Sequence, residues 1–552
     1  MRKVDKRRVC GEKWSYYTPS SATRPAVKTF LQTLPGLVFG CLRGFDRLVF
    51  RGYLRSLMSA SGMNVYLWTN GVTFRDFKAH AQQRTDQLIA ASEAVAKRQD
   101  RPVEYLRSPQ MRKEDRAWEV AKRDGIADGL IGMFTCVEPC WSYTVRGNGG
   151  TKRLELRSEL RQCLHLYHYY QHPRFGLMYA RVQTWFPFTV QIGINGREWL
   201  CRSLDAAGLK YRRSDNCVTW VEDIAWAQKL LDGQLRVNWS RRLHEVRGWV
   251  HPTHPELLGK YKADYYWTLS QSEWATDVLF RDRQELQRRY GSWLRFALTS
   301  YSSPDVLRFL GKKLPGHGGV NGHYEGEVLS DLGRRVDGLR IKHRAGANSV
   351  KMYDKAQGSV LRVETTINDP SEFKVYRGKE GDESGEMQLR QLRSGVADVH
   401  RRAEVSEASN ERYLAGLAAT TCAEPLKAVT AQLSRRVREP GRGERRVRGL
   451  NLLGDEDAAV LAVVGRPEFG LNGLRNRDVV AGLYAKPTTD ETEQRRRSSR
   501  ATRLLRLLRA HGILQKVPKS HRYRVSERGR MVITAVLAAR NSATEKLVAL
   551  AA

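Results

Sequence analysis

The helical periodicity of residues 454–540 is the feature that most constrains the fold of this chain. Leu504, Leu505 and Leu508 recur at helical spacing in a segment that Gly512 ends, so a helix with one buried face is expected over Ala501–His511. The pattern predicts two further helices before it and, after it, two short strands and a last helix. These are Asp455–Val464, a turn at 470–474, Arg475–Tyr484, Ile513–Lys516, His521–Val525 and a helix from Ser526 or Glu527 to Arg540.

Basic side chains accompany this pattern, since Arg503, Arg506 and Arg509 would lie opposite the buried leucines. Three helices followed by a basic hairpin resemble the winged-helix DNA-binding domains of bacterial regulators and replication proteins. The resemblance spans roughly a fifth of the chain, and it implies that the third helix enters a major groove while the hairpin contacts the flanking backbone or the minor groove. The implied DNA-binding residues are Arg503, Arg506, Arg509, Lys516, Lys519, His521, Arg522 and Arg524. A helical bundle with a charged face is the alternative, and some winged helices bind protein or RNA.

The charge of the chain indicates the chemistry of its partner. The chain carries 94 Lys and Arg against 59 Asp and Glu, a formal net charge of +35, and a polyanion relieves that self-repulsion. Nucleic acid is the expected polyanion, because Lys and Arg displace the counterions of phosphates. No apolar run reaches about 18 residues and no apolar segment follows the basic N-terminus, so neither a membrane partner nor a signal peptide is predicted. Eight cysteines do not make a disulfide scaffold in a chain of this length. We expect a cytoplasmic protein of a prokaryote, on nucleoid, plasmid or phage DNA.

The length of 552 residues and the mixture of strand and helix patterns predict an α+β protein of several domains. We expect a mixed α/β N-terminal domain, a β-rich central domain, a hairpin followed by a long helix, an arginine-rich linker and the C-terminal winged helix. Their expected bounds are 1–130, 131–310, 327–430, 431–453 and 454–552. Leu37–Phe39 and Leu48–Phe50 are predicted as separate strands, and Met387–Ala418 as one long or broken helix.

A strand, turn and strand pattern follows at residues 351–364. Lys351–Lys355 is separated by a turn at Gln357 and Gly358 from a second strand that begins at Val360. Because side chains alternate along a strand, four chemically able residues would share one face of this hairpin. They are Tyr353, Lys355, Arg362 and Glu364.

This hairpin is similar to strands of the rolling-circle replication initiators of plasmids and small phages. In that family a tyrosine attacks the DNA backbone and becomes linked to the phosphate, while a divalent metal and basic side chains hold the phosphate. The resemblance covers about twenty residues. It implies Tyr353 as the nucleophile, Lys351, Lys355 and Arg362 as phosphate-holding groups, Glu364 as a metal ligand, and Mg²⁺ or Mn²⁺ as the cofactor.

Two histidines on one strand normally complete the metal site of that family, and here the chain departs from the pattern. Its histidine cluster is His165, His168 and His172. His165 and His168 are the expected ligands beside Glu364. On a regular strand they would point to opposite faces, so a shared ion requires a bulge or a helix at this place.

Two other metal sites fit the sequence. Cys136, Cys140 and Cys163, together with the histidine cluster, offer the ligand types of structural zinc. Asp46 is alternatively the first carboxylate of an RNase H-like nuclease, a fold shared by many transposases, with two metal ions held by further acids. The candidate partners of Asp46 are Asp215, Asp277 and Glu364, and the sequence does not choose among them.

Aromatic and basic residues alternate between Trp141 and Trp199, a mixture that suits either a β-rich core or the stacking of single-stranded bases. Together these patterns predict a DNA-binding protein of a plasmid, phage or transposable element that nicks DNA through a tyrosine and a divalent metal. A regulator without catalytic activity is one alternative. An RNA-binding or RNA-guided protein is the other.

Overall fold

The computed structural model describes residues 30–543 of the chain, with gaps at 109–110, 302, 313–327, 336–337, 380–385, 422–425, 440–445, 467–468, 470–472, 485 and 518–520. Among the residues it describes, no helix combines the length and the apolar character needed to cross a membrane.

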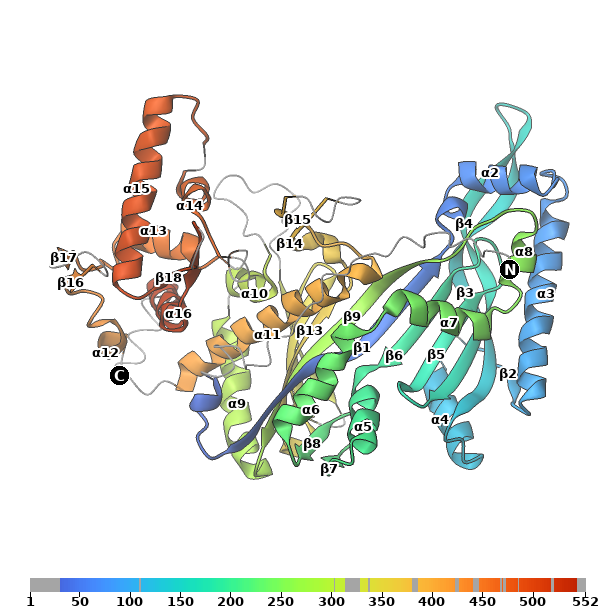
Figure 1. Ribbon diagram of the computed structural model, residues 1–552, viewed down its shortest axis with the longest axis horizontal. Helices are drawn as coiled ribbons and strands as arrows, with labels where there is room; N and C mark the ends of the chain where they lie inside the picture. Colours follow the sequence, from blue (N-terminus) through green and yellow to red (C-terminus); the bar gives the residue numbers. More distant parts are fainter. Residues whose placement is uncertain are drawn as a thin grey trace, which may run out of the picture.

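One sheet of eleven strands forms the centre of the molecule (Figure 1). Neighbouring strands are antiparallel, except for β2 and β3, which run parallel. In spatial order the strands are β10 (Leu329–Arg335), β11 (Gly338–Ala345), β12 (Asn348–Lys355), β13 (Val360–Ile367), β9 (Tyr266–Phe280), β1 (Val38–Tyr53), β6 (Val190–Asn195), β5 (Gly176–Gln183), β4 (Arg153–His172), β3 (Gly129–Asn148) and β2 (Val103–Tyr105).

The order of the strands corrects the expected division into domains. β1 pairs with β6 on one side and with β9 on the other, and β9 pairs with β13. The segments 1–130, 131–310 and 327–430 therefore share one sheet instead of forming separate β units. The two strands expected at Leu37–Phe39 and Leu48–Phe50 are parts of the single 16-residue strand β1. The mixed α and β content is as expected.

Helices cover one face of the sheet along its length. This covered face carries the apolar residues of β9, β13 and β12, which pack on α9 (Arg283–Ser300), α10 (Ser303–Leu310) and α11 (Val399–Thr421). Further along, the same face packs on α3 (Phe77–Arg98) and α7 (Trp239–Val250). Shorter helices complete this side of the molecule: α2 (Ala60–Thr69) and α8 (His254–Leu258).

In the described part of the chain, two groups of elements cover the opposite face. α5 (Gly196–Ala206) and α6 (Ile224–Leu231), with the small hairpin β7 (Tyr211–Arg213) and β8 (Val218–Val221), pack on one end of β1, β9 and β13. α4 (Lys113–Arg123) packs on β3 and β4. Between these two covers, the face carries polar and charged side chains from the middle of the sheet. We call it the polar face.

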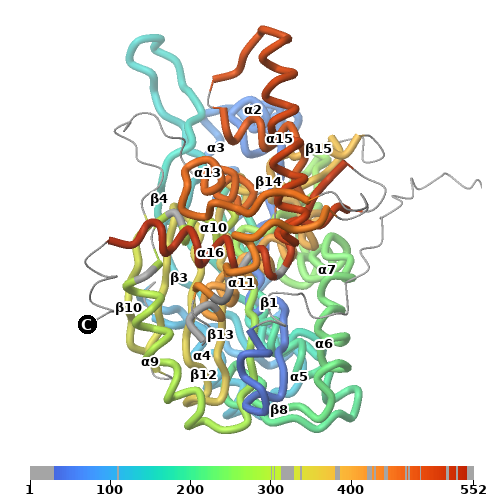
Figure 2. The backbone as a smooth tube through the Cα atoms, turned by 90° about the vertical axis from the view of Figure 1, so that its left-hand side faces the viewer, coloured from blue at the N-terminus to red at the C-terminus, as the bar shows by residue number. Residues whose placement is uncertain are grey.

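β3 and β4 form a long hairpin whose end projects from the molecule (Figures 1 and 2). Each of the two strands has 20 residues. The histidine cluster lies in the part of β4 that pairs with β5.

The segment expected to be one helix, Met387–Ala418, begins differently. Gln388–Gln391 is a strand, β15, that pairs with β14 (Lys374–Arg377), and the helix α11 starts only at Val399. The isolated β-bridge between Thr268 and Gly395 and the burial of Val399 tie this segment to the main sheet. Tertiary pairing therefore outweighs the helical pattern at its start.

The C-terminal residues form a compact unit with its own apolar core (Figure 1). Its elements are α13 (Asp455–Val464), α14 (Asn476–Leu483), α15 (Glu491–Ala510), β18 (Leu514–Lys516), β19 (Tyr523–Val525) and α16 (Glu527–Asn541). This is the order predicted from the sequence, and Leu504, Leu505 and Leu508 are buried as expected.

Two details of the unit differ from expectation. The third helix starts at Glu491, ten residues before the predicted start at Ala501, because Asp490 caps it through the backbone N–H of Thr492. The arginine-rich linker contributes Leu433 and Leu450 to the core of the unit. It also contains a small hairpin of β16 (Val437–Arg438) and β17 (Arg446–Val447), and the short helix α12 (Leu426–Thr430) directly precedes it.

Candidate active site

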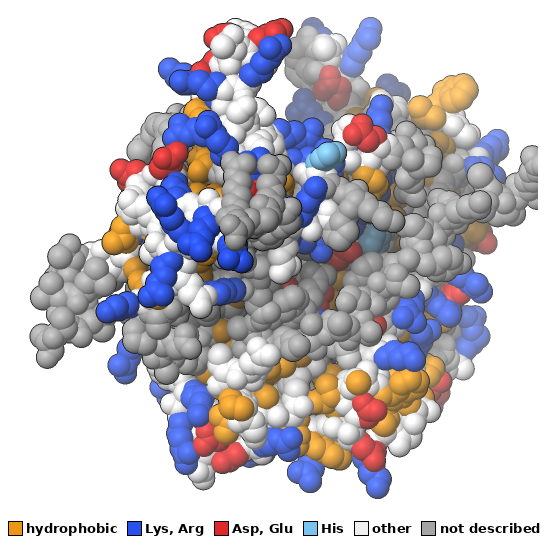
Figure 3. Space-filling view, turned by 60° about the vertical axis from the view of Figure 1, so that its left-hand side comes forward, with side chains coloured by type: hydrophobic (Ala, Val, Ile, Leu, Met, Phe, Trp, Pro, Cys, Tyr) orange, Lys and Arg blue, Asp and Glu red, His pale blue; other side chains and the backbone are white. Residues whose placement is uncertain are grey.

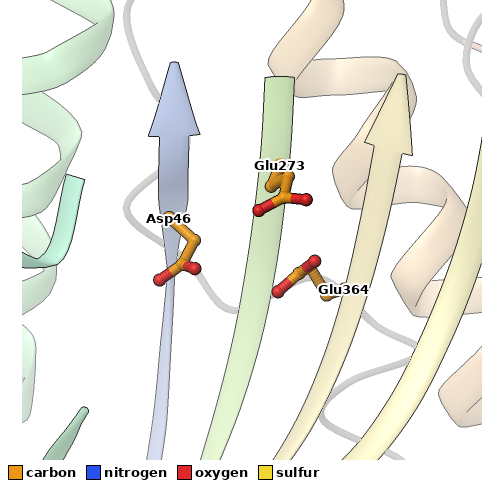
Figure 4. A group of neighbouring side chains, drawn as sticks. All are labelled: Asp46, Glu273 and Glu364. Carbon is orange, nitrogen blue, oxygen red and sulfur yellow. The ribbon is translucent and has the colours of Figure 1, made fainter. Parts of the chain in front are cut away.

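Three carboxylates from three neighbouring strands converge on the polar face. Asp46 on β1, Glu273 on β9 and Glu364 on β13 each offer an oxygen, and these oxygens all lie within 4.8 Å of one another (Figure 4). Within the described part of the chain, no other group of three or more His, Cys, Asp or Glu side chains converges in this way. We call these residues the acidic triad.

The register of the strands explains the convergence. Glu364 pairs with Ala275 on β9, two residues from Glu273, so both acids project from the same face. Asp46 lies where the pairing of β1 with β9 shifts by one residue, between Phe45 and Arg47. Such a bulge re-aims a side chain, and here it brings the Asp46 carboxylate onto the polar face, whereas Phe45 packs against Trp274 in the core.

Lys351 lies inside the acidic triad. Its Nζ donates to Glu364 at 2.6 Å and to Glu273 at 3.1 Å. This placement follows from the hairpin, because Lys351 on β12 pairs directly with Glu364 on β13. Lys351 therefore pairs its single positive charge with two of the three carboxylates.

Arg362 holds Asp46 in position and does not face solvent. Its side chain is fully buried, and it donates to both carboxylate oxygens of Asp277, at 2.6 and 2.8 Å, and to Asp46 at 2.9 Å. Arg197 adds a second buried cation 3.0 Å from Asp277. The expectation that Arg362 holds a phosphate is corrected by these contacts, since its guanidinium group is committed to buried acids. Asp277 belongs to this ion-pair network and not to the acidic triad.

The members of the acidic triad differ in the direction of their pKa shifts. Burial raises the pKa of Asp46, and burial together with Glu364 raises the pKa of Glu273. Burial acts in the same direction on Glu364, but Lys351 and Arg362 outweigh it and lower its pKa to about 2. Glu364 is therefore the firmly ionised member, and a cation bound among the three would favour the ionised forms of the other two.

Tyr353 is joined to the acidic triad by a short hydrogen bond. Its hydroxyl donates to the second oxygen of Glu364 at 2.5 Å. Burial and the charge of Glu364 raise the pKa of Tyr353 well above its ordinary value of 10, so the hydroxyl is protonated at neutral pH. The ring is half-buried at the edge of the site. The predicted hairpin is confirmed, because Tyr353 pairs with Arg362 and Lys351 with Glu364.

Lys355 lies at the end of the same strand, on the same face as Tyr353. Its Nζ is 3.5 Å from the carboxylate of Asp215, which is largely exposed. Asp215 therefore stands apart from the acidic triad, and of the three partners considered for Asp46 only Glu364 joins it.

The histidines expected beside Glu364 lie elsewhere. β4 is five strand positions from β13, which at about 4.8 Å per strand places His165 and His168 roughly 24 Å from Glu364. The two rings also point to opposite faces. His165 Nε2 accepts a hydrogen bond from Arg181 on the polar face, whereas the ring of His168 is buried on the covered face of the sheet. The structure therefore corrects the expected ligand set of His165, His168 and Glu364.

The cysteines expected to bind zinc are free thiols: Cys136, Cys140 and Cys163. Interaction with Cys140 lowers the pKa of Cys163 to about 6, so these two thiols are close neighbours on β3 and β4. Among the described residues, no histidine lies close enough to these thiols to share a metal ion with them. The geometry favours an oxygen-rich site for a hard cation over a zinc site.

Glu273 is the member of the acidic triad that the sequence did not point to. The signal was a second carboxylate, besides Asp277, in the strand Tyr266–Phe280, whose other residues are apolar, aromatic or uncharged polar. A carboxylate in such a segment needs a partner when it becomes buried, and Lys351 is that partner.

The described residues among those expected to bind DNA all belong to the C-terminal unit. Arg503, Arg509, Lys516, His521 and Arg524 are exposed. Arg506 is half-buried and 3.3 Å from Glu439, and the guanidinium of Arg522 lies over the ring of Tyr376 at 4.1 Å. Lys519 is outside the described residues. Figure 3 looks onto the side that carries this unit and shows Lys and Arg side chains gathered over its upper part.

Comparisons with protein-family models, with curated proteins and with solved structures gave no match to this chain.

Proposed function

We propose that this chain is a DNA-binding, metal-dependent strand-nicking enzyme of a plasmid, phage or transposable element, with Tyr353 as its nucleophile. The observation that carries the proposal is the 2.5 Å hydrogen bond between the Tyr353 hydroxyl and Glu364, a member of the acidic triad. A nucleophile, a carboxylate that can take its proton and a set of hard oxygen ligands thus lie together.

Mg²⁺ or Mn²⁺ fits the acidic triad, because both ions prefer carboxylate oxygens. When bound, such an ion polarises the phosphate and stabilises the oxygen that leaves. Asp46, Glu273 and Glu364 would hold it. Lys351 now lies between two of these acids, so it would turn away from them and toward the phosphate, where its charge offsets that of the DNA.

Tyr353 would attack the phosphorus of the DNA backbone. As its oxygen forms the new bond, its proton passes to Glu364, and the bond between phosphorus and one deoxyribose oxygen breaks. The departing deoxyribose oxygen takes up that proton from Glu364, so the strand is left with a free hydroxyl on one side and a phosphotyrosine link on the other. Lys355 lies on the same face and would contact the neighbouring phosphate.

The C-terminal unit would deliver this site to duplex DNA as a winged helix. Its order of elements and the exposed Arg503 and Arg509 support this role. Replacing either arginine by glutamine should weaken duplex binding and reduce the dependence of log Kd on log salt by about 0.9 for each lost phosphate contact. Arg241→Gln on α7, where Arg241 is largely exposed and pairs with Glu245, is the matched control.

A nicking assay tests the proposal. Supercoiled plasmid is incubated with the full chain and Mg²⁺ or Mn²⁺, and relaxed DNA and protein–DNA adducts are measured on denaturing gels. Tyr353→Phe should abolish both products. Tyr266→Phe, on β9 of the same sheet, should leave both unchanged. Cleavage that persists without an adduct in Tyr353→Phe would remove this tyrosine from the mechanism.

A regulator that binds DNA without cutting it is the second candidate. The contacts of Lys351 favour it, because they neutralise part of the acidic triad without any ion. In that case the chain binds duplex DNA equally well in EDTA and with Mg²⁺, and no nicked product forms with any divalent metal.

A further inference from the structure

A second feature of the polar face is a cavity beside the acidic triad. Its volume is about 230 Å³, and residues of β1, β4, β5 and β6 form its floor. Arg47 lines it and also connects it to the acidic triad. Arg47 on β1 pairs directly with Glu273 on β9, so its side chain lies on the same face as this member of the triad.

The cavity explains part of the aromatic and basic mixture in the sequence. Alternation along β4 and β5 divides these residues between the two faces. Tyr167, Tyr169, Tyr179 and Arg181 line the cavity, whereas Tyr170 packs in the core of the covered face. Tyr179 is the half-buried ring among the three tyrosines, the other two being nearly covered.

Positive charge dominates the walls of the cavity. Arg47, Arg112, Lys113 and Arg181 line it, and Glu114 is the acid among its lining residues. Lys113 and Arg181 are held in place by Glu138, at 3.0 and 3.5 Å. Arg47 and Arg112 are exposed, and Arg112 is 75% exposed in its side chain. Lys113 and Arg181 are therefore fixed, whereas Arg47 and Arg112, which pairs at the surface with Asp115 at 3.4 Å, can adjust to a ligand.

The first turn of α4 also faces the cavity, through residues 112–114. The N-terminus of a helix carries partial positive charge and attracts phosphate. Together with the four basic side chains, this helix end makes the cavity suited to an anion that carries a ring. Its volume is below the roughly 300 Å³ at which sites for drug-sized ligands begin, so a fragment of one strand fits and a duplex does not.

We propose that this cavity binds one nucleotide of a single DNA strand next to the phosphate that Tyr353 attacks. The phosphodiester would lie against Arg47, Arg112 and the first turn of α4, with the base beside the ring of Tyr179. The placement of the strand rests on the proposed nicking function, because Arg47 is the contact that leads from the cavity to the acidic triad. The site requires DNA that is unpaired where it enters the polar face.

Photo-crosslinking tests the proposal. The full-length Tyr353→Phe protein is mixed in EDTA with a twelve-nucleotide oligo(dT) that carries one 5-iodouracil, irradiated and digested, and the linked peptide is identified by mass spectrometry. The expected crosslink is on Tyr179 or its neighbours on β4 and β5. Crosslinks confined to the C-terminal unit would overturn the proposal.

The affinity of the protein for fluorescent oligo(dT) is a second test of the same cavity. Arg112→Gln and Arg47→Gln should each weaken the affinity about tenfold, whereas Arg288→Gln on the distant α9 should not change it. Free dTMP should compete poorly. Competition by dTMP as strong as that by the oligonucleotide would show a mononucleotide site and contradict the assignment to a strand.

The two proposals fail separately in these experiments. Neither binding assay needs a metal or the Tyr353 hydroxyl, so a crosslink at Tyr179 without plasmid nicking would sustain the cavity and reject the nicking function. Nicking without any crosslink in the cavity would sustain the nicking function and reject the cavity as a binding site.

Discussion

The polar face and the core of the same sheet each hold a group of residues that commonly bind metals. The acidic triad joins three strands whose register turns every carboxylate to one face, with Lys351 among them. His165 and His168 are close in sequence on one strand, yet their rings lie on opposite sides of the sheet. The contrast shows that metal-ligand spacing along a chain is informative only when the local structure and its periodicity are known.

Replacing Glu364 by glutamine should have the largest effect on activity. The change removes a carboxylate ligand and the acceptor of the Tyr353 proton, so nicking should fall at least about 100-fold. Rates are measured on supercoiled plasmid, with circular dichroism to check folding. His165→Gln is the control and should keep its nicking activity. If His165→Gln lost as much nicking activity as Glu364→Gln, the histidine would be as important for nicking as the acidic triad, contrary to expectation.

Replacing Arg362 by leucine should have the largest effect on stability. The change leaves the buried carboxylates of Asp277 and Asp46 without the positive charge of Arg362. Removing one partner of a buried ion-pair network lowers the free energy of unfolding by about 3–5 kcal/mol. The free energy of unfolding in urea measures this cost. Arg288→Gln, on an exposed ion pair, should change it by about 0.5 kcal/mol or less. A small effect of Arg362→Leu would mean that the acidic triad is not held by this network.

The buried histidines predict how stability depends on pH. Burial lowers the pKa of His165 and His168 to about 4 in the folded chain. The unfolded chain, with values near 6.5, therefore binds protons first, and stability is lost as the pH falls from about 6.5 to about 4. Each histidine accounts for up to about 3 kcal/mol of that loss. In urea unfolding at a series of pH values, His168→Gln should show a shallower fall than the unchanged protein. Curves of equal slope would count against a neutral, buried His168.

Addition of Mn²⁺ should stabilise the folded protein through the acidic triad. At a concentration of 100 times its Kd, a ligand specific for the folded state adds about 2.7 kcal/mol. Thermal unfolding with and without Mn²⁺ should show this increase in the unchanged protein and in His168→Gln. It should be absent in Glu273→Gln, where one ligand is lost on a half-buried side chain. Stabilisation that survives Glu273→Gln but not His168→Gln would place the ion on β4.

The local parts of the site could be predicted from the sequence. Period-two alternation placed Tyr353, Lys355 and Glu364 on one face, and helical periodicity gave the order of the C-terminal elements. The pairing of β1 with β9 could not be predicted, because more than two hundred residues separate the two strands and no local pattern in the sequence indicates which strands pair. For that reason Glu273 was missed and the sheet was divided into separate domains. The bulge that turns Asp46 to the polar face depends on the same pairing.

Anomalous scattering from crystals grown with Mn²⁺ shows directly whether the acidic triad binds a metal ion. The expected result is a peak within about 2.0–2.6 Å of carboxylate oxygens of Asp46, Glu273 and Glu364, with the Lys351 amine displaced from between Glu273 and Glu364. Crystals with no peak at the acidic triad at saturating Mn²⁺, or with the peak at His165 or His168 instead, would contradict it.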